Sequence, residues 1–191
     1  MANSRPQRPH LLGIDDGPFE KHIAGAETPL VGVMMEGADL VEAVAVSSFP
    51  VDGDEVTGFL GQWIDSLRFR PSLQGVLFGG ITIAGLGVVD VDRLAKRLGL
   101  PVLIVNRRPP LDPPLLAALR SAGFQDRIPI VLRAPAARRA GGLFVSAAGG
   151  SVDRVEALLL ACIGKSDLPE PLRVAHLMAR ALVSGESRGK P

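Results

Sequence analysis

Three apolar runs of strand length follow one another before any stretch with helical spacing. They span residues 11–14, 30–35 and 40–47, and the connection Glu36-Gly37-Ala38-Asp39 between the last two has the length and residue types of a hairpin loop. This order predicts three successive antiparallel strands at the start of the fold. A Rossmann domain is excluded, because it would begin with a strand-helix-strand unit.

The chain then changes to alternating helices and strands. Asp54 is expected to cap a first helix, in which residues 59–67 place their large apolar side chains at helical spacing. The order predicts a ribonuclease H-like α/β fold, in which three antiparallel strands precede parallel strands in one mixed sheet flanked by helices. The further expected elements are a strand at 75–78, a glycine-rich loop at 79–87, a helix at 90–98, a strand at 102–105, a helix at 113–122, an apolar run at 128–132, an edge strand at 141–145, and helices at 152–163 and 169–183.

The first expected strand ends on two carboxylates, Asp15 and Asp16, before Gly17-Pro18 stops the ladder. Side chains alternate along a strand, so the two carboxylates point to opposite faces and only one can belong to a given site. We choose Asp15, because Gly13 shares its face and leaves room for a ligand or an incoming backbone. The alternative is that the pair only terminates the strand in a turn.

The composition describes one globular domain with an aliphatic core. Of 191 residues, 47% are hydrophobic, while aromatics make up 4% and tyrosine is absent, so base-stacking platforms are not expected. The expected domain spans 11–185, between disordered tails at 1–10 and 186–191. The N-terminus lacks an apolar signal segment, and glycines interrupt the longest uncharged run, 71–89, so no membrane span is expected. The single cysteine, Cys162, is expected to be buried in a cytoplasmic protein.

A net charge of +1 conceals two halves of opposite sign. Residues 13–65 contain eleven Asp and Glu against one Lys, whereas residues 66–139 contain twelve Lys and Arg against four Asp. A metal-dependent enzyme acting on a polyanion needs carboxylates for the cation and arginines for the phosphates. Two oppositely charged halves can equally attract each other within the fold.

Other polar groups offer candidate ligands. Asp52 and Asp54 flank Gly53 where the first helix begins, and could join Asp15 around a cation that prefers oxygen ligands. Arg173 and His176 share one face of the last helix, where a lone histidine can also be an ordinary packing residue. No P-loop, nucleophilic serine elbow or zinc motif is present, and the glycines of the 79–87 loop do not complete a dinucleotide fingerprint.

Four stretches, in this order, carry a family resemblance. The chain resembles an uncharacterised prokaryotic family, domain of unknown function ninety-nine, which is related to endonuclease V. The stretches are Leu12-Gly13-Ile14-Asp15-Asp16-Gly17-Pro18-Phe19, Val51-Asp52-Gly53-Asp54-Glu55-Val56-Thr57, Gly80-Ile81-Thr82-Ile83-Ala84-Gly85-Leu86-Gly87-Val88-Val89-Asp90, and Pro169-Glu170-Pro171-Leu172-Arg173-Val174-Ala175-His176-Leu177, followed by Gly185-Glu186-Ser187.

The resemblance implies a ribonuclease H-like nuclease that uses Mg²⁺ or Mn²⁺ to hydrolyse a phosphodiester bond beside a deaminated base. Asp15 lies where endonuclease V carries its first metal-binding aspartate, and Asp52 and Asp54 lie near the position of its catalytic glutamate. These three aspartates form the implied metal-binding set, and His176 of the last helix joins them in the expected catalytic set. Phosphate binding is assigned to the second half of the chain, at Arg107, Arg108 and Arg173.

Three positions depart from the endonuclease V or family pattern. Gly79 stands where endonuclease V has another metal-binding aspartate, Ala148-Gly149-Gly150-Ser151 replaces the stretch that carries its late histidine, and Gly87 replaces an expected asparagine. Two hypotheses therefore compete. The first is an Mg²⁺-dependent nuclease, and the second is a non-catalytic relative that binds nucleic acid or a small phosphorylated ligand. The sequence leaves open the choice of DNA or RNA, the base preference, the partner proteins and the oligomeric state.

Overall fold

The computed structural model describes residues 8–20, 23, 25–110 and 112–188. His22 and the terminal stretches 1–7 and 189–191 lie outside these residues, so the expectations for them are not addressed. Some described residues that the sequence analysis assigned to the tails nevertheless have contacts within the fold. Arg8 pairs with Asp39 at 2.7 Å, His10 opens the first strand, and residues 186–188 line a pocket described below.

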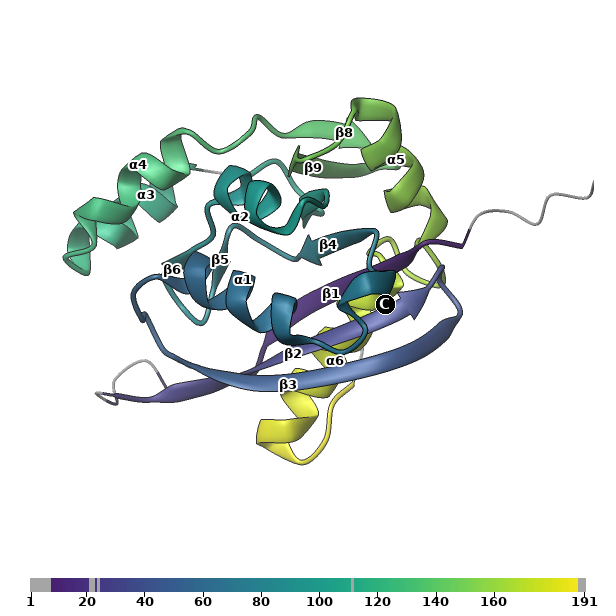
Figure 1. Cartoon of the computed structure of the whole chain (residues 1–191). Helices are drawn as coiled ribbons and strands as arrows, with labels where there is room; N and C mark the ends of the chain where they lie inside the picture. Colours follow the sequence, from purple (N-terminus) through teal and green to yellow (C-terminus); the bar gives the residue numbers. More distant parts are fainter. Residues whose placement is uncertain (1–7, 21–22, 24, 111, 189–191) are drawn as a thin grey trace, which may run out of the picture.

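A seven-stranded mixed sheet runs through the centre of the molecule (Figure 1). Its spatial order is β3-β2-β1-β4-β7-β9-β8. The first three strands are antiparallel, β1, β4 and β7 are parallel, and β9 and β8 return antiparallel. The strands are β1 His10–Asp16, β2 Glu27–Glu36, β3 Leu40–Pro50, β4 Gly75–Phe78, β7 Val102–Asn106, β8 Arg138–Ala140 and β9 Leu143–Ala148, and a separate hairpin is formed by β5 Thr82–Ile83 and β6 Gly87–Val88.

Helices cover both faces of the sheet. Figure 1 shows α1 in front of the first strands and α6 behind them. The α-helices are α1 Val56–Ser66, α2 Val91–Leu98, α3 Asp112–Ser121, α4 Ile128–Leu132, α5 Val152–Ala161 and α6 Glu170–Ser184, and the short 3₁₀ turns are Arg70–Ser72 and Gln125–Arg127. None of the helices in the described parts of the chain is both long and apolar enough to cross a membrane.

Alternation along β1 divides the core into two layers. Leu12 and Ile14 pack with α1 and α2, whereas Leu11 packs on the other face with α5 and Leu172 of α6. Cys162 is fully buried in this second layer, as expected. The same alternation sends Asp15 to the α6 face and Asp16 to the opposite one.

The close approach of α6 to the sheet depends on Gly13. A Cβ atom at this position would overlap the backbone of Pro171 and Leu172 at the start of α6. The space that Gly13 leaves on the face of Asp15 is therefore filled by an incoming backbone, which was one of the two expectations for it. As a result, the first turns of α6 lie directly over the end of β1.

The predicted ribonuclease H-like order of elements is confirmed, but two local predictions are wrong. The strand predicted at 141–145 is not an edge, because β9 pairs with both β7 and β8, and β8 is the edge strand. Asp54 does not cap α1, because the cap position is occupied by Glu55 in a left-handed conformation without a side-chain hydrogen bond. The carboxylate of Asp54 instead pairs with Arg127.

Candidate active site

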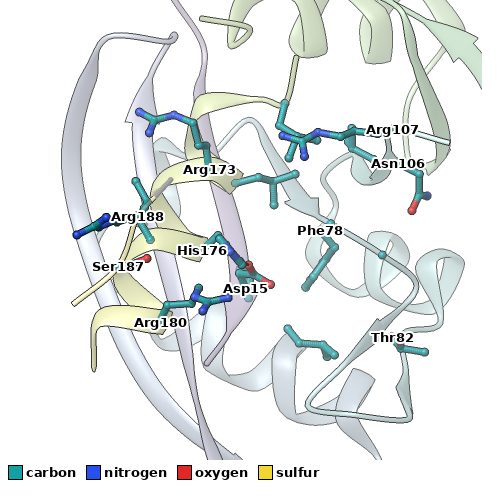
Figure 2. Close-up of a pocket in the computed structure, with 18 of the residues that line it drawn as sticks. Asp15, Phe78, Thr82, Asn106, Arg107, Arg173, His176, Arg180, Ser187 and Arg188 are labelled. Carbon is teal, nitrogen blue, oxygen red and sulfur yellow. The ribbon is translucent and has the colours of Figure 1, made fainter. Parts of the chain in front are cut away.

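Asp15 and His176 meet where β1 ends beneath α6. The Oδ2 atom of Asp15 and the Nδ1 atom of His176 share a hydrogen bond of 2.7 Å. Asp15 belongs to the last residues of β1, and His176 lies in the second turn of α6, so each side chain is positioned by a regular element. Figure 2 shows the two side chains pointing toward one another inside a pocket.

Burial and charge oppose each other at the two neighbouring aspartates. Burial raises the pKa of Asp15, while the hydrogen bond and charge of His176 act to lower it. The pKa of Asp16 is raised to about 6, mainly by burial and then by the negative charge of Asp15. The strand end therefore holds two carboxylates of which one is readily protonated in mildly acidic solution.

The pocket around this pair has a volume of about 1020 Å³. Its lining combines apolar side chains with the cationic side chains of residues 107, 173, 180 and 188. Such a combination suits a ligand that has both a flat apolar portion and phosphates. The lining residues are Ile14, Asp15, Phe78, Gly79, Gly80, Thr82, Ile83, Val105, Asn106, Arg107, Leu168, Leu172, Arg173, His176, Leu177, Arg180, Ser184, Glu186, Ser187 and Arg188.

Helix α6 presents a basic stripe to the pocket. Arg173, His176 and Arg180 are spaced by three and four residues, which places them on one face of the helix. Arg173 pairs with Glu170 at 2.6 Å, and this interaction raises the pKa of Arg173. Figure 2 shows the guanidinium group of Arg180 directed toward Asp15. The sequence prediction included Arg173 and His176 but missed Arg180, although the same helical spacing indicates it.

The other two predicted phosphate-binding residues follow one another after β7, and only one of them reaches the pocket. Arg107 lines the pocket, whereas Arg108 is exposed and is not part of the lining. Figure 2 shows Arg107 extending toward Arg173 and its neighbour Asn106 pointing the other way. Of the predicted arginines, Arg107 and Arg173 therefore share the pocket with Asp15.

The segment after α6 also belongs to the pocket wall. Glu186, Ser187 and Arg188 line the pocket, although the sequence predicted a disordered tail from residue 186. The hydroxyl oxygen of Ser187 is buried and finds no hydrogen-bond partner among the described residues. The motif Gly185-Glu186-Ser187 is therefore part of the site architecture.

Asp52 and Asp54 are used to fix the β5–β6 hairpin next to the pocket. The Oδ1 atom of Asp52 accepts a 2.7 Å hydrogen bond from the backbone N–H of Leu86. Arg127 is buried and donates to the carbonyl oxygens of Leu86 and Asp52 and to Oδ1 of Asp54, at 2.7 to 2.9 Å. Neither Asp52 nor Asp54 lines the pocket.

Asp16 holds the same hairpin from the sheet. Its Oδ2 atom accepts a 3.1 Å hydrogen bond from the backbone N–H of Ala84, a residue with a positive φ of 51°. Asp16 and Asp52 thus bind neighbouring parts of one hairpin, and the hairpin in turn places Thr82 and Ile83 in the pocket wall. The structure brings Asp15 and His176 together but gives the other carboxylates a different use.

Of the departures from the endonuclease V pattern, one lies in the pocket and another lies outside it. Gly79 lines the pocket at the end of β4, and a Cβ atom there would meet no other atom within 4 Å. Ser151, in the stretch without a histidine, accepts a hydrogen bond from the backbone N–H of Arg154 and caps α5. Gly79 therefore leaves open the space that a side chain would occupy, whereas Ser151 serves as a helix cap.

The donor set for a divalent cation in the pocket is small. Mg²⁺ is commonly held by one or two carboxylates and completed by water and substrate phosphates. Asp15 fits this pattern, with Glu186 as a second carboxylate in the lining and the imidazole of His176 alongside. Among the described residues, the group of three or more acidic or histidine side chains with ligand atoms within 4.8 Å of one another is His10, Glu36 and Glu42, at the other end of β1.

The fold and the pocket define a class of protein. The catalytic domain of human endonuclease V superposes with a TM-score of 0.59 and 18% identity, over 95% of this chain and 86% of that one. Endonuclease V of Ciona intestinalis, in complex with a 24mer DNA containing an inosine followed by a ribo-adenosine, gives 0.54 and 12%, over 88% and 83%. These similarities establish a ribonuclease H-like fold of the endonuclease V type.

Closer relatives identify the family. The UPF0215 protein of Pyrococcus horikoshii is 36% identical over 182 residues, covering 93% of this chain and 94% of its own length. A protein of unknown function from Archaeoglobus fulgidus superposes with a TM-score of 0.84 and 30% identity, over 93% of this chain and 100% of that one. The family model described as Endonuclease dU matches residues 7–183. The chain belongs to this endonuclease V-related family.

Proposed function

We propose that this protein is a divalent-cation-dependent endonuclease that hydrolyses a phosphodiester bond beside a deaminated base. The single observation that carries the proposal is the Asp15–His176 pair at 2.7 Å in a pocket lined by several arginines. A carboxylate at a strand end suits a hard cation, and guanidinium groups suit phosphate oxygens. The pocket thus combines the two kinds of group that hydrolysis of a polyanion requires.

Each side chain has a proposed part in binding or orientation. Arg107, Arg173 and Arg180 would hold phosphates of the nucleic acid around Asp15. Asp15 would hold the Mg²⁺ or Mn²⁺ ion, and His176 would fix the orientation of the Asp15 carboxylate through their hydrogen bond. When bound, the cation would supply an activated water molecule and stabilise charge on the phosphate.

The names of the relatives suggest the first substrates to try. The family description names dU, and the Ciona intestinalis endonuclease V was crystallised with DNA containing inosine. Uracil and hypoxanthine are both products of base deamination, so we propose nucleic acid containing deoxyuridine or inosine as the substrate class. We also propose that the reaction occurs in the cytoplasm, where a buried thiol such as Cys162 stays reduced.

A cleavage assay tests the proposal. Labelled DNA and RNA oligonucleotides of one sequence, carrying deoxyuridine, inosine or the undamaged base, are incubated with the protein and Mg²⁺, Mn²⁺ or EDTA. We expect cleavage of a modified strand with either cation and none with EDTA. An absence of cleavage for every oligonucleotide and cation would reject the endonuclease.

One observation favours a second function, a non-catalytic nucleic-acid-binding protein. Gly79 offers no ligand, and the carboxylates of Asp16, Asp52 and Asp54 are hydrogen-bonded within the protein. In this case the arginines would bind a strand, or a small phosphorylated ligand, without turnover. The same oligonucleotides would then bind equally well with EDTA and with Mg²⁺, and none would be cut.

A further inference from the structure

Three side chains form a continuous row across the last strands of the sheet. Asn106 of β7 is directly opposite Phe144 of β9, and Phe144 is directly opposite Arg139 of β8. Residues that face each other on paired strands project to the same face of the sheet. Asn106, Phe144 and Arg139, which we call the Arg139 row, therefore lie side by side on one face.

The outer end of this row carries an ordered positive charge. The guanidinium carbon of Arg139 lies 5.6 Å from the centre of the Phe144 ring, within the range of a cation–π interaction. Arg139 is exposed and forms no ion pair with the described residues. Phe144 thus favours this position of the guanidinium group without neutralising its charge.

The inner end of the row is the pocket itself. Asn106 and the next residue, Arg107, both line the pocket. Adjacent strands lie about 4.8 Å apart, so Arg139 is about 10 Å from Asn106. Asp15 lies on β1, two strands further from β8 than β7 is, so Arg139 is about 20 Å from Asp15.

We propose that a nucleic-acid strand leaves the pocket past Asn106 and lies across the Arg139 row, where Arg139 contacts a phosphate several nucleotides from the reacting bond. Phe144 acts as a positioning residue that orders the guanidinium group. This inference rests on the proposed function, because it takes the strand in the pocket to be nucleic acid. It adds a contact outside the pocket on one side of the cleavage position.

Binding of oligonucleotides by fluorescence anisotropy, with EDTA to prevent cleavage, tests the row. The probes are a deoxyuridine trinucleotide and two single strands that extend it by six nucleotides, one on the 5′ side and one on the 3′ side. The variants are Arg139→Ala and Phe144→Leu, with Arg120→Ala as a control, because Arg120 is an exposed arginine of α3 and does not line the pocket. Thermal unfolding confirms that each variant is folded.

We expect Arg139→Ala to weaken binding of one of the two extended strands by about three- to tenfold and to leave trinucleotide binding unchanged. Loss of one phosphate contact should also reduce the slope of the logarithm of the association constant against the logarithm of the salt concentration, by about 0.7 for a single strand. Phe144→Leu should weaken the same strand by a smaller factor, because the charge remains but is no longer ordered.

The outcomes separate this inference from the proposed function. If the wild type binds both extended strands and Arg139→Ala behaves like Arg120→Ala, the row is not a binding surface and the proposed function stands. If Arg139→Ala weakens the trinucleotide as much as the extended strands, the effect is not that of a remote contact and the inference is wrong. If the wild type binds none of the probes, no strand reaches the row and the inference is rejected, while the cleavage assay still decides the proposed function.

Discussion

Asp15 and His176 are 161 residues apart in the sequence and share a 2.7 Å hydrogen bond. The contact exists because Gly13 allows the backbone of Pro171 to rest on β1, which brings the second turn of α6 over the end of that strand. The side chain of Asp15 is 27% exposed and that of His176 is 51% exposed. The pair is therefore held by buried backbone packing while its polar atoms remain open to the pocket.

The contact predicts how His176 influences the pH dependence of cleavage. His176 lowers the pKa of Asp15, which burial raises. Replacement by alanine removes the lowering effect, so Asp15 takes up a proton at a higher pH. In the His176→Ala protein we expect the acidic limb of the single-turnover rate profile to move to higher pH. A limb at the wild-type position would show that Asp15 does not control it.

Asp16 predicts a pH-dependent change in stability. Its pKa of about 6 exceeds the unfolded value of 3.8, so between these pH values the native state binds more protons than the unfolded state. Stability from this group is therefore lost as the pH rises from about 4 to 6. Asp16→Asn removes that loss and keeps an oxygen for the N–H of Ala84. We expect it to be more stable than the wild type at pH 7, by on the order of 1 kcal/mol.

Urea unfolding of both proteins at pH 4 and pH 7 measures the effect. The advantage of Asp16→Asn over the wild type should be larger at pH 7 than at pH 4, because at pH 4 the wild-type carboxyl is largely protonated in the folded state. Equal differences at the two pH values would mean that Asp16 has an ordinary pKa in the folded protein.

Arg127 and Asp54 form an ion pair, but we expect the two residues to contribute unequally to the stability of the fold. Arg127 is buried and also serves two carbonyl oxygens, and its guanidinium carbon lies 3.9 Å from the centre of the Phe124 ring. The side chain of Asp54 is 88% exposed. We expect Arg127→Ala to lower the free energy of unfolding by about 3 kcal/mol, since two partly buried carbonyl oxygens lose their donor and the packing on Phe124 is lost. Asp54→Ala should cost less than about 1 kcal/mol.

Chemical denaturation of the two variants measures both losses of unfolding free energy. Similar losses would mean that the ion pair, and not the carbonyl contacts, ties the residues around Arg127 to the hairpin. Asp54→Ala also tests the role implied by the resemblance to endonuclease V. If that carboxylate is a metal ligand, the variant would be stable but would need much more Mg²⁺ for cleavage.

Gly79 predicts a gain of function. An aspartate at this position meets no atom at its Cβ and does not require a positive φ, so the fold should accept it. Its carboxylate would enter the pocket beside Asp15 and supply a further hard ligand. We expect Gly79→Asp to bind Mn²⁺ about tenfold more tightly than the wild type, a difference of about 1.4 kcal/mol.

Calorimetric titration with Mn²⁺ measures this change, with a His10→Ala background in every protein. That substitution removes one donor of the His10, Glu36 and Glu42 cluster, which offers a separate place for a cation. Unchanged affinity in Gly79→Asp would show that the pocket does not hold a cation near the end of β4.

Most of the strands, and the choice of Asp15 over Asp16, were accessible from the sequence because both follow from local patterns. Apolar runs bounded by glycine and proline marked the strands, and the position of Gly13 distinguished Asp15 from Asp16. The short edge strand β8 was missed because Arg138-Arg139-Ala140 has no apolar pattern of its own. It pairs only because β9 supplies a neighbour.

The remaining errors share one physical cause, which is contact between distant segments. Asp54 has the local appearance of a helix cap, but an arginine 73 residues later takes its carboxylate. Arg180 has the local appearance of a solvated residue on an amphipathic helix, and its place in the pocket depends on how α6 crosses the sheet. Local spacing does not reveal the partner of Asp54, and it places Arg180 on the face of Arg173 and His176 without showing that this face meets a pocket.

Single-turnover cleavage by Asp15→Asn tests the central claim most directly. The substrate is the modified oligonucleotide that the wild type cuts, with Mn²⁺ present, and binding of the same strand is measured in parallel by anisotropy with EDTA. The account predicts that Asp15→Asn binds the strand within about threefold of the wild type and cleaves it at least about a hundredfold more slowly. Cleavage by Asp15→Asn at the wild-type rate would contradict it, because the strand end beneath α6 would then not be the reaction site.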